Sequence, residues 1–135
     1  MADAFKFELV SPERLLVSED VLEVVVPGQE GYFTVLSNHA PLMAGLQPGV
    51  VEVKNASGAE ERYCVFGGFV DIVPDSCTLL AESAVNVKDV NADDVAQRIE
   101  NAREDLQDAK GDDAVAKAQL YLDQLTTLQK SILPA

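Results

Sequence analysis

Residues 27–49, PGQEGYFTVLSNHAPLMAGLQPG, decide how this chain folds. The stretch opens with a Pro-Gly pair and an acidic turn, continues into the apolar run at residues 32–36, and closes with a second Pro-Gly pair at Pro48 and Gly49. Glycine and proline beside short apolar runs are typical of strands joined by tight turns. The stretch therefore predicts the centre of a β domain.

Further strands are expected on both sides of this stretch. Phe5, Phe7 and Leu9 alternate with polar residues, so their side chains can share one face of a strand. The sequence NASG at residues 55–58 predicts a hairpin turn. The expected strands cover residues 5–9, 21–26, 32–36, 50–54, 62–66, 69–73 and 77–81. So many short strands with near-adjacent turns predict a sandwich or flattened barrel.

The spacing of apolar residues changes after residue 89 from two to alternating steps of four and three, which is typical of helices. We expect Asn91 to cap a first helix, Gly111 to end it in a left-handed conformation, and Asp112 to cap a second. The apolar stripes of the two helices are Val95, Ile99, Ala102, Leu106 and Ala109, and Ala114, Ala118, Tyr121, Leu125, Leu128 and Ile132.

The two stripes match if the chain folds back at Gly111, because Ile99 then faces Leu125 and Leu106 faces Ala118. This predicts an antiparallel two-helix hairpin. The expected fold class is therefore α+β: an N-terminal β-sandwich or flattened barrel at residues 1–88, followed by a helical hairpin at residues 89–135.

Composition excludes several classes of protein. The 135 residues include 23 acidic and 10 basic side chains, a formal charge of −13 that repels nucleic acids and anionic lipids. A hydrophobic fraction of 47% excludes a disordered chain, and no apolar run approaches the roughly 20 residues of a membrane-spanning helix. We expect no secretion or import peptide and no nucleic-acid partner.

Few residues suggest catalytic chemistry. His39 is the only histidine, and Pro41 two residues later is typical of a constrained loop. Cys64 and Cys77 lack metal-ligand spacing, which predicts two buried, reduced thiols. Gly67-Gly68 lies outside any phosphate-binding motif and predicts a bulge or sharp bend. No catalytic residue, cofactor or metal ion is expected.

Two motifs together resemble the signature of the epsilon subunit of F-type ATP synthases. The first consists of Pro27-Gly28, the acidic turn, His39-Ala40-Pro41-Leu42 and Leu46-Gln47-Pro48-Gly49; the second is FGGFVDI at residues 66–72. The resemblance covers the first two thirds of the chain.

The resemblance implies a non-catalytic rotor subunit of the central stalk, which couples proton translocation to ATP synthesis. It implies contacts with the gamma subunit at Ser11, His39 and Ala44, and with the membrane ring of c subunits at Gln29, Glu30 and Tyr32. The expected location is the cytoplasmic face of a bacterial plasma membrane, reached only through the complex.

Relatives in this family can bind ATP on the hairpin, or extend it into the alpha/beta catalytic head as a brake on hydrolysis. The corresponding segment here, residues 90–95, has neither the Asp nor the Arg at the positions where those relatives carry them. Asp94 stands at the position of the cation. The last helix offers only Lys117 and Lys130 for charge contacts. We therefore expect no tight ATP binding and only weak inhibition.

Two other hypotheses start from different features. The acidic tip at residues 108–113 is similar to that of hairpin factors acting on RNA polymerase, although those place the hairpin before the globular domain. Helix capping by Asp112 and Asp113 is a sufficient explanation of the acidity, and we favour it. A small β-fold enzyme, finally, would depend on His39.

Overall fold

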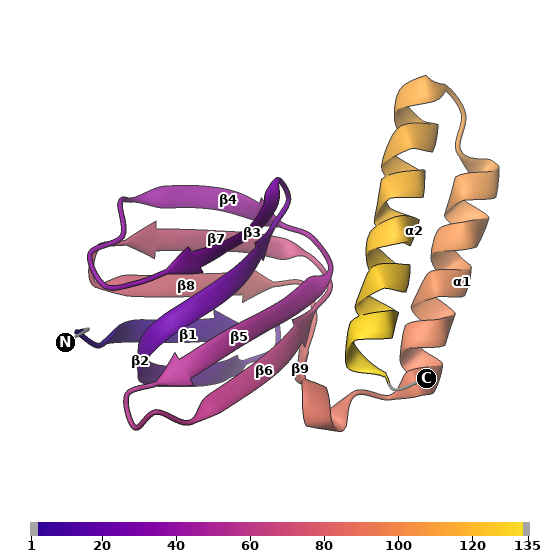
Figure 1. Cartoon of the computed structure of the whole chain (residues 1–135). Coiled ribbons are helices and arrows are strands. Elements are labelled where there is room, and N and C mark those ends of the chain that lie inside the picture. The colour runs from indigo at the N-terminus through magenta and orange to yellow at the C-terminus, as the bar shows by residue number, and fades with distance from the viewer. Residues whose placement is uncertain (1–2, 134–135) are drawn as a thin grey trace. The chain divides into compact units, whose positions relative to one another are not determined.

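The computed structural model describes residues 3–133 (Figure 1). The chain divides into two compact units, one ending at Asn86 and the other beginning at Val87. Residues Val87–Asp89 form a short 3-10 helix, η1, and the expected domain boundary between residues 88 and 89 falls within it.

The first unit consists of short strands in a single sheet. In chain order these are β1 (Phe5–Val10), β2 (Leu15–Gly28), β3 (Gly31–Val35), β4 (Leu42–Leu46), β5 (Gly49–Asn55), β6 (Glu60–Val65), β7 (Gly68–Val73), β8 (Ser76–Ala81) and β9 (Ala84–Asn86).

The sheet closes on itself through its first strand. Its order is β1-β8-β7-β4-β2-β5-β6-β9, with β3 paired to β2, and β1 pairs with β8 on one side and β2 on the other. The pairing of β1 with β8 is parallel, whereas the other strand pairs are antiparallel. This closure gives the β-sandwich that the sequence predicted.

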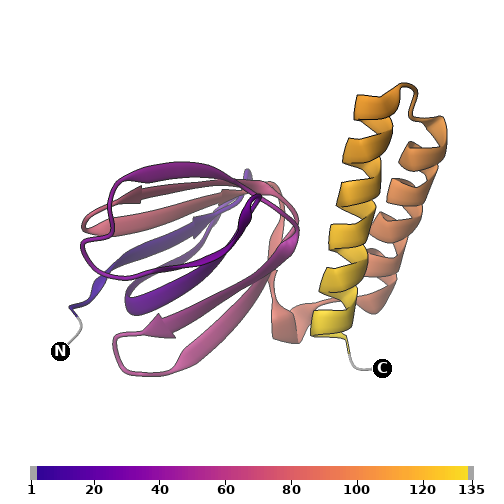
Figure 2. The ribbon, with the colours of Figure 1, turned by 45° about the horizontal axis from the view of Figure 1, so that its top comes forward.

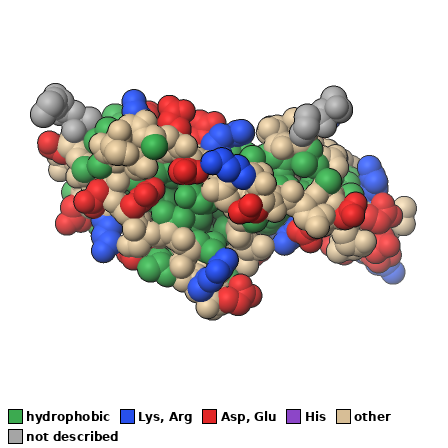
Figure 3. Space-filling model, turned by 90° about the horizontal axis from the view of Figure 1, so that it is seen from below, with side chains coloured by type: hydrophobic (Ala, Val, Ile, Leu, Met, Phe, Trp, Pro, Cys, Tyr) green, Lys and Arg blue, Asp and Glu red, His purple; other side chains and the backbone are tan. Residues whose placement is uncertain are grey.

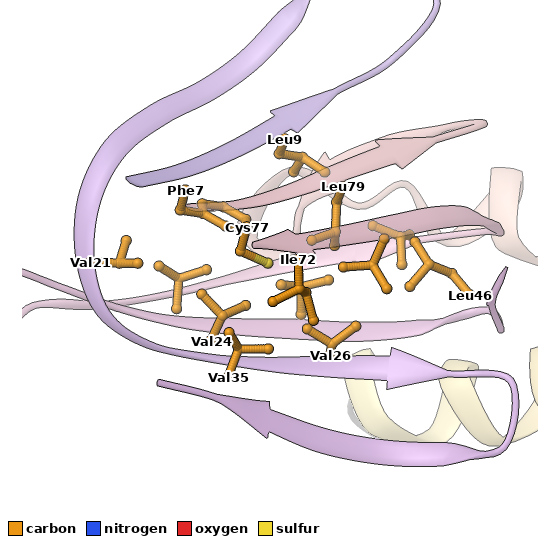
Figure 4. Close-up of a cluster of buried hydrophobic side chains, with 14 of the residues drawn as sticks. Phe7, Leu9, Val21, Val24, Val26, Val35, Leu46, Ile72, Cys77 and Leu79 are labelled. Atoms are coloured by element: carbon orange, nitrogen blue, oxygen red, sulfur yellow. The ribbon is translucent and has the colours of Figure 1, made fainter. Parts of the chain in front are cut away.

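The core fills the interior of this closed sheet (Figure 4). The predicted alternation of β1 is confirmed, since Phe5, Phe7 and Leu9 are all buried. Buried residues on β2 and on the strands opposite pack against them, namely Val21, Val24, Val26, Val35, Leu46, Ile72, Cys77 and Leu79. At roughly 1.5 to 3 kcal/mol for each large side chain, this cluster is the main stabilising term of the unit.

Two strands were not predicted, and one is longer than expected. The alternation that marks a strand is missing in β4, which is short, contains Gly45 and lies between Pro41 and Pro48. Strand β9 has three residues, too few for any pattern. Strand β2 begins at Leu15, where Leu15, Leu16 and Val17 are consecutive apolar residues without a visible period.

The predicted turn and bend are both present. The side chain of Asn55 accepts hydrogen bonds from the backbone N–H of Ser57 (3.1 Å) and Ala59 (2.9 Å), which closes the β5–β6 hairpin. Gly67 and Gly68 have φ values of 130° and 127°, a region that L side chains rarely adopt. The chain therefore bends sharply where β7 begins.

The second unit is an antiparallel pair of helices, α1 (Ala92–Asp108) and α2 (Asp112–Ile132) (Figures 1 and 2). The predicted cap is confirmed, because the Asn91 side chain accepts from Asp93 N (2.8 Å) and Asp94 N (3.2 Å). Five stripe residues are buried, while those near the tip are more exposed: the buried set is Val95, Ile99, Ala102, Leu125 and Leu128.

The predicted connection between the helices was wrong in detail. Helix α1 ends at Asp108 with Ala109 as its C-cap, so Gly111 does not terminate it. Gly111 has φ 91° and ψ 152° and occupies the N-cap position of α2, whose first helical residue is Asp112. Glycine has no side chain to accept an N–H, so this helix start lacks a side-chain cap and relies on the acidic first turn.

Acidic side chains are scattered over the face of the molecule that Figure 3 shows. None of the described helices is long and apolar enough to cross a membrane.

Candidate interaction surfaces

The tip of the β2–β3 hairpin presents two of the predicted ring-facing residues. Gly28 pairs with Gly31, which leaves Gln29 and Glu30 exposed at the end of the hairpin. Gly31 has φ 133°, and a Cβ on Gly28 would lie 2.8 Å from the Gly31 carbonyl oxygen. A turn this tight requires glycine on both sides.

Neighbouring segments hold this turn in place. The backbone N–H of Gln29 donates to the Gly45 carbonyl oxygen at 2.9 Å, and Gln47 N–H donates to Pro27 O at 3.0 Å. The Gln47 side chain also reaches the turn, because its Nε2 donates to Gly28 O at 2.7 Å. Gln47 was not among the predicted site residues, since its partner lies 19 positions away.

Tyr32, the third predicted ring-facing residue, is bound to the body of the sandwich. Its hydroxyl oxygen accepts the Val50 N–H at 3.1 Å, although 53% of the residue is exposed. A Cβ on Gly49 would lie 2.4 Å from that oxygen and 2.6 Å from the Pro27 Cβ. The side chain of Tyr32 therefore needs a residue without a Cβ at position 49, and its hydroxyl ties β3 to β5.

An open groove of about 400 Å³ lies beside the turn. Its lining combines the polar residues Gln29 and Glu30 with Leu42 and Met43 of β4, and includes Gly28, Gly31, Phe33, Ala44 and Gly45. Met43 is 71% exposed. A surface that combines apolar and polar groups in this way is suited to a protein partner.

The three predicted gamma-facing residues lie at separate places. Ser11 is buried, and its backbone forms a turn with Arg14 through hydrogen bonds of 2.9 and 3.2 Å. His39 is half-buried, its ring centroid 6.3 Å from that of Phe33. Ala44 is partly buried against the core and lines the groove beside the turn.

An exposed apolar row, which the sequence analysis missed, crosses the outer face near Ser11. Phe69 on β7 pairs with Leu80 on β8, Leu80 with Val10 on β1, and Val10 with Leu15 on β2. Directly paired residues share one face of a sheet, so the four side chains form a continuous row. Phe69 is 60% exposed and Leu80 49%.

The row borders a shallow groove of about 290 Å³ that Ser11, Pro12 and Glu82 also line. Adjacent apolar residues such as Leu79 and Leu80 were the available signal, because a strand that is apolar on both faces is covered on both. Exposed apolar rows with polar borders mark protein interaction sites.

Catalytic chemistry has little support in the described part of the chain. The Nδ1 atom of His39 lies 2.7 Å from the Ala40 carbonyl oxygen, so this nitrogen carries the proton and is occupied by the backbone. Within residues 3–133 no three His, Cys, Asp or Glu side chains gather into a metal site.

Both cysteines are buried and neither forms a disulfide, as predicted. Burial, reinforced by the carboxylate of Asp71, raises the pKa of Cys77 to about 12, so the thiol stays protonated at neutral pH. A neutral, inaccessible thiol is a poor nucleophile.

Comparison with known proteins places the chain in a family. The family model described as ATP synthase, Delta/Epsilon chain, beta-sandwich domain matches residues 4–87. The chain is 67% identical to the ATP synthase epsilon chain of Mesorhizobium japonicum and 56% identical to that of Brucella anthropi, with full coverage of both chains in each case.

Two solved structures share the fold at low identity. A chain of the Euglena gracilis mitochondrial ATP synthase (OSCP/F1/c-ring) superposes with a TM-score of 0.73 at 22% identity, covering 95% of this chain and 81% of that one. A chain of the Tetrahymena thermophila mitochondrial ATP synthase (central stalk/c-ring) gives 0.62 at 17%, covering 96% and 98%.

These matches decide between the hypotheses that the sequence left open. The full-length identity confirms the resemblance carried by residues 27–49 and leaves the RNA polymerase factor and the small β-fold enzyme without support. The chain belongs to the epsilon-chain family of F-type ATP synthases, whose members are non-catalytic subunits of the central stalk.

Proposed function

We propose that this chain connects the gamma subunit to the ring of c subunits, so that rotation driven by proton flow passes through its β unit to the catalytic head. The observation that carries the proposal is the presence of two distinct exposed surfaces on one closed sandwich: the β2–β3 turn and the apolar row. Close packing resists deformation, which transmission of torque requires.

The turn is the ring-facing surface in this proposal. Gln29 and Glu30 are its exposed polar groups, suited to the polar loops of a membrane ring. Tyr32 lies beside them, and its hydroxyl accepts the Val50 N–H, which fixes the side chain on the body of the sandwich. In this proposal Gln29 and Glu30 contact the ring of c subunits directly, and Tyr32 holds the strand beside them.

The apolar row and the loops beside it form the gamma-facing surface. Ser11 adjoins the row through their shared groove. His39, in the loop before β4, and Ala44, in the groove beside the turn, lie away from the row, so contact with them would extend the gamma interface to that groove. Burial of Phe69 and Leu80 would supply most of the binding free energy, because large apolar side chains dominate such interfaces.

We further propose that residues 1–88 and 89–135 act as separate domains, and that contact of the hairpin with the alpha/beta head inhibits hydrolysis only weakly. Lys117 and Lys130 are the basic residues of α2. The tip of the hairpin and α2 together carry four acidic residues, Asp108, Asp112, Asp113 and Asp123. Deleting residues 89–135 should change the rate of ATP hydrolysis less than about twofold. An increase of severalfold would contradict this charge argument.

The proposed location is the cytoplasmic face of a bacterial plasma membrane, where the chain is held through the complex. Recovery of gamma and c with tagged chain from detergent-solubilised membranes is the expected result. Recovery of the chain alone would refute the proposed function.

Single introduced cysteines test the two surfaces separately, because native Cys64 and Cys77 are buried. We expect Glu30→Cys to cross-link to c and Phe69→Cys to cross-link to gamma. Ser57→Cys, at the exposed β5–β6 turn, is the control and should cross-link to neither. Exchange of the two partners would overturn the assignment of the surfaces.

A further inference from the structure

The ring-facing turn is held by two side-chain hydrogen bonds that join the hairpin to residues distant in the sequence. Gln47 Nε2 donates to Gly28 O at 2.7 Å, and the Tyr32 hydroxyl accepts Val50 N–H at 3.1 Å. Both bonds are partly buried and span 19 and 18 positions of the chain. They attach the hairpin tip to Gln47, between β4 and β5, and to Val50 near the start of β5.

The backbone alone holds the tip at few points. Gly28 and Gly31 flank it, and glycine leaves the backbone the greatest conformational freedom. A Cβ on Gly31 would meet nothing within 4 Å. Strand β4 pairs with β2 at a single position, Gly28 with Leu46, and two further backbone bonds join Gln29 N–H to Gly45 O and Gln47 N–H to Pro27 O. The side-chain bonds add to these few backbone bonds in fixing how Gln29 and Glu30 are presented.

We propose that Gln47 and Tyr32 are positioning residues: they hold the β2–β3 turn in its ring-binding conformation and do not themselves contact the ring. This inference rests on the proposed function, because it assumes that the turn faces the c subunits. A preorganised loop binds more tightly because its ordering is not paid for on binding.

The local effect can be measured on the isolated chain. Gln47→Met keeps the length of the side chain and removes its donor, and Tyr32→Phe removes only the hydroxyl. Loss of one such bond should speed amide hydrogen exchange at residues 29–31 about fivefold, and loss of both roughly 25-fold. The amides of residues 55–59, in the distant β5–β6 turn, are the internal control.

The functional effect is measured on membranes depleted of the native chain and reconstituted with variants. Gln47→Met should raise the concentration of chain needed for half-maximal ATP-driven proton pumping roughly threefold or more, with the maximum retained. Gln47→Lys keeps a nitrogen donor at this position and should restore the native value. Gln119→Met, on an exposed face of α2, is the matched control.

Each outcome decides the inference. Unchanged exchange at residues 29–31, or faster exchange with an unchanged half-maximal concentration, would overturn the positioning role while leaving the proposed function intact. Failure of the native chain itself to restore proton pumping would instead refute the proposed function. An equal loss in Gln47→Met and Gln47→Lys would also overturn the role of the donor.

Discussion

Replacement of Gly68 by alanine should destabilise the β unit more than any other glycine substitution with a comparable backbone conformation. Gly68 has φ 127°, and a Cβ there would lie 2.1 Å from the carbonyl oxygen of Leu80 and 2.9 Å from the Cα of Ala81. Both are backbone atoms of β8, the strand paired with β7. They cannot rotate away as a side chain can, so the strands must separate locally.

The chain offers a matched comparison. Gly31 has φ 133° but no atom within 4 Å of its ideal Cβ. Gly31→Ala therefore reports only the backbone strain, on the order of 1–3 kcal/mol. Gly68→Ala carries that strain and also disrupts about two ladder hydrogen bonds, each worth about 0.5–1.5 kcal/mol. We expect it to lower the free energy of unfolding by about 1–3 kcal/mol more than Gly31→Ala.

The assay is urea unfolding of the full chain, followed through the methyl NMR signals of Val70 and Leu79 in the β-unit core. The separate unfolding of the hairpin then does not enter the measurement. A difference between Gly68→Ala and Gly31→Ala below about 0.5 kcal/mol would refute the argument that the contact with β8 is rigid.

Three further predictions concern other parts of the chain. Asn91→Ala should destabilise the hairpin by about 1 kcal/mol, measured by amide exchange in α1, whereas Asn101→Ala on the exposed face should change it little. Burial raises the pKa of Cys77 from 9.0 to about 12. The contribution of this thiol to the free energy of unfolding should therefore be fully present below pH 9 and be lost as the pH rises toward 12. Thermal unfolding of native chain and Cys77→Ala across that range checks this, and equal slopes would contradict it. Calorimetric titration of micromolar chain with ATP should give no saturable heat, because Asp94 stands where the ATP-binding relatives have a cation, and it pairs with Arg98 at 3.3 Å. A micromolar Kd would disprove this prediction.

Periodicity was sufficient to predict most of the fold. The alternation of Phe5, Phe7 and Leu9 identified β1, and the stripe through Val95 and Ile99 identified α1, since both patterns follow from burial of one face. Strand β4 was not predicted, because it contains Gly45, lies between two prolines and shows no alternation of apolar and polar residues. The helix connection was misjudged because a glycine with positive φ suits either the end of one helix or the start of the next.

The candidate sites were less predictable, because their geometry depends on contacts between distant residues. Exposure of Gln29 and Glu30 followed from the turn motif alone. The bond from Val50 to Tyr32 and the row from Phe69 to Leu15 join residues that only strand register brings together. Sequence spacing carries no record of register between strands so far apart.

The parallel pairing of β1 with β8 constrains the order in which this protein can fold during synthesis. Lys6 aligns with Ser76 and Val10 with Leu80, so the opening strand of the chain waits for residues synthesised some seventy positions later. On the ribosome, the sandwich cannot close until β8 has left the exit tunnel, and such distant contacts slow folding. Until then β1 has β2 as its only partner, and its other edge stays available to pair with strands of neighbouring nascent chains.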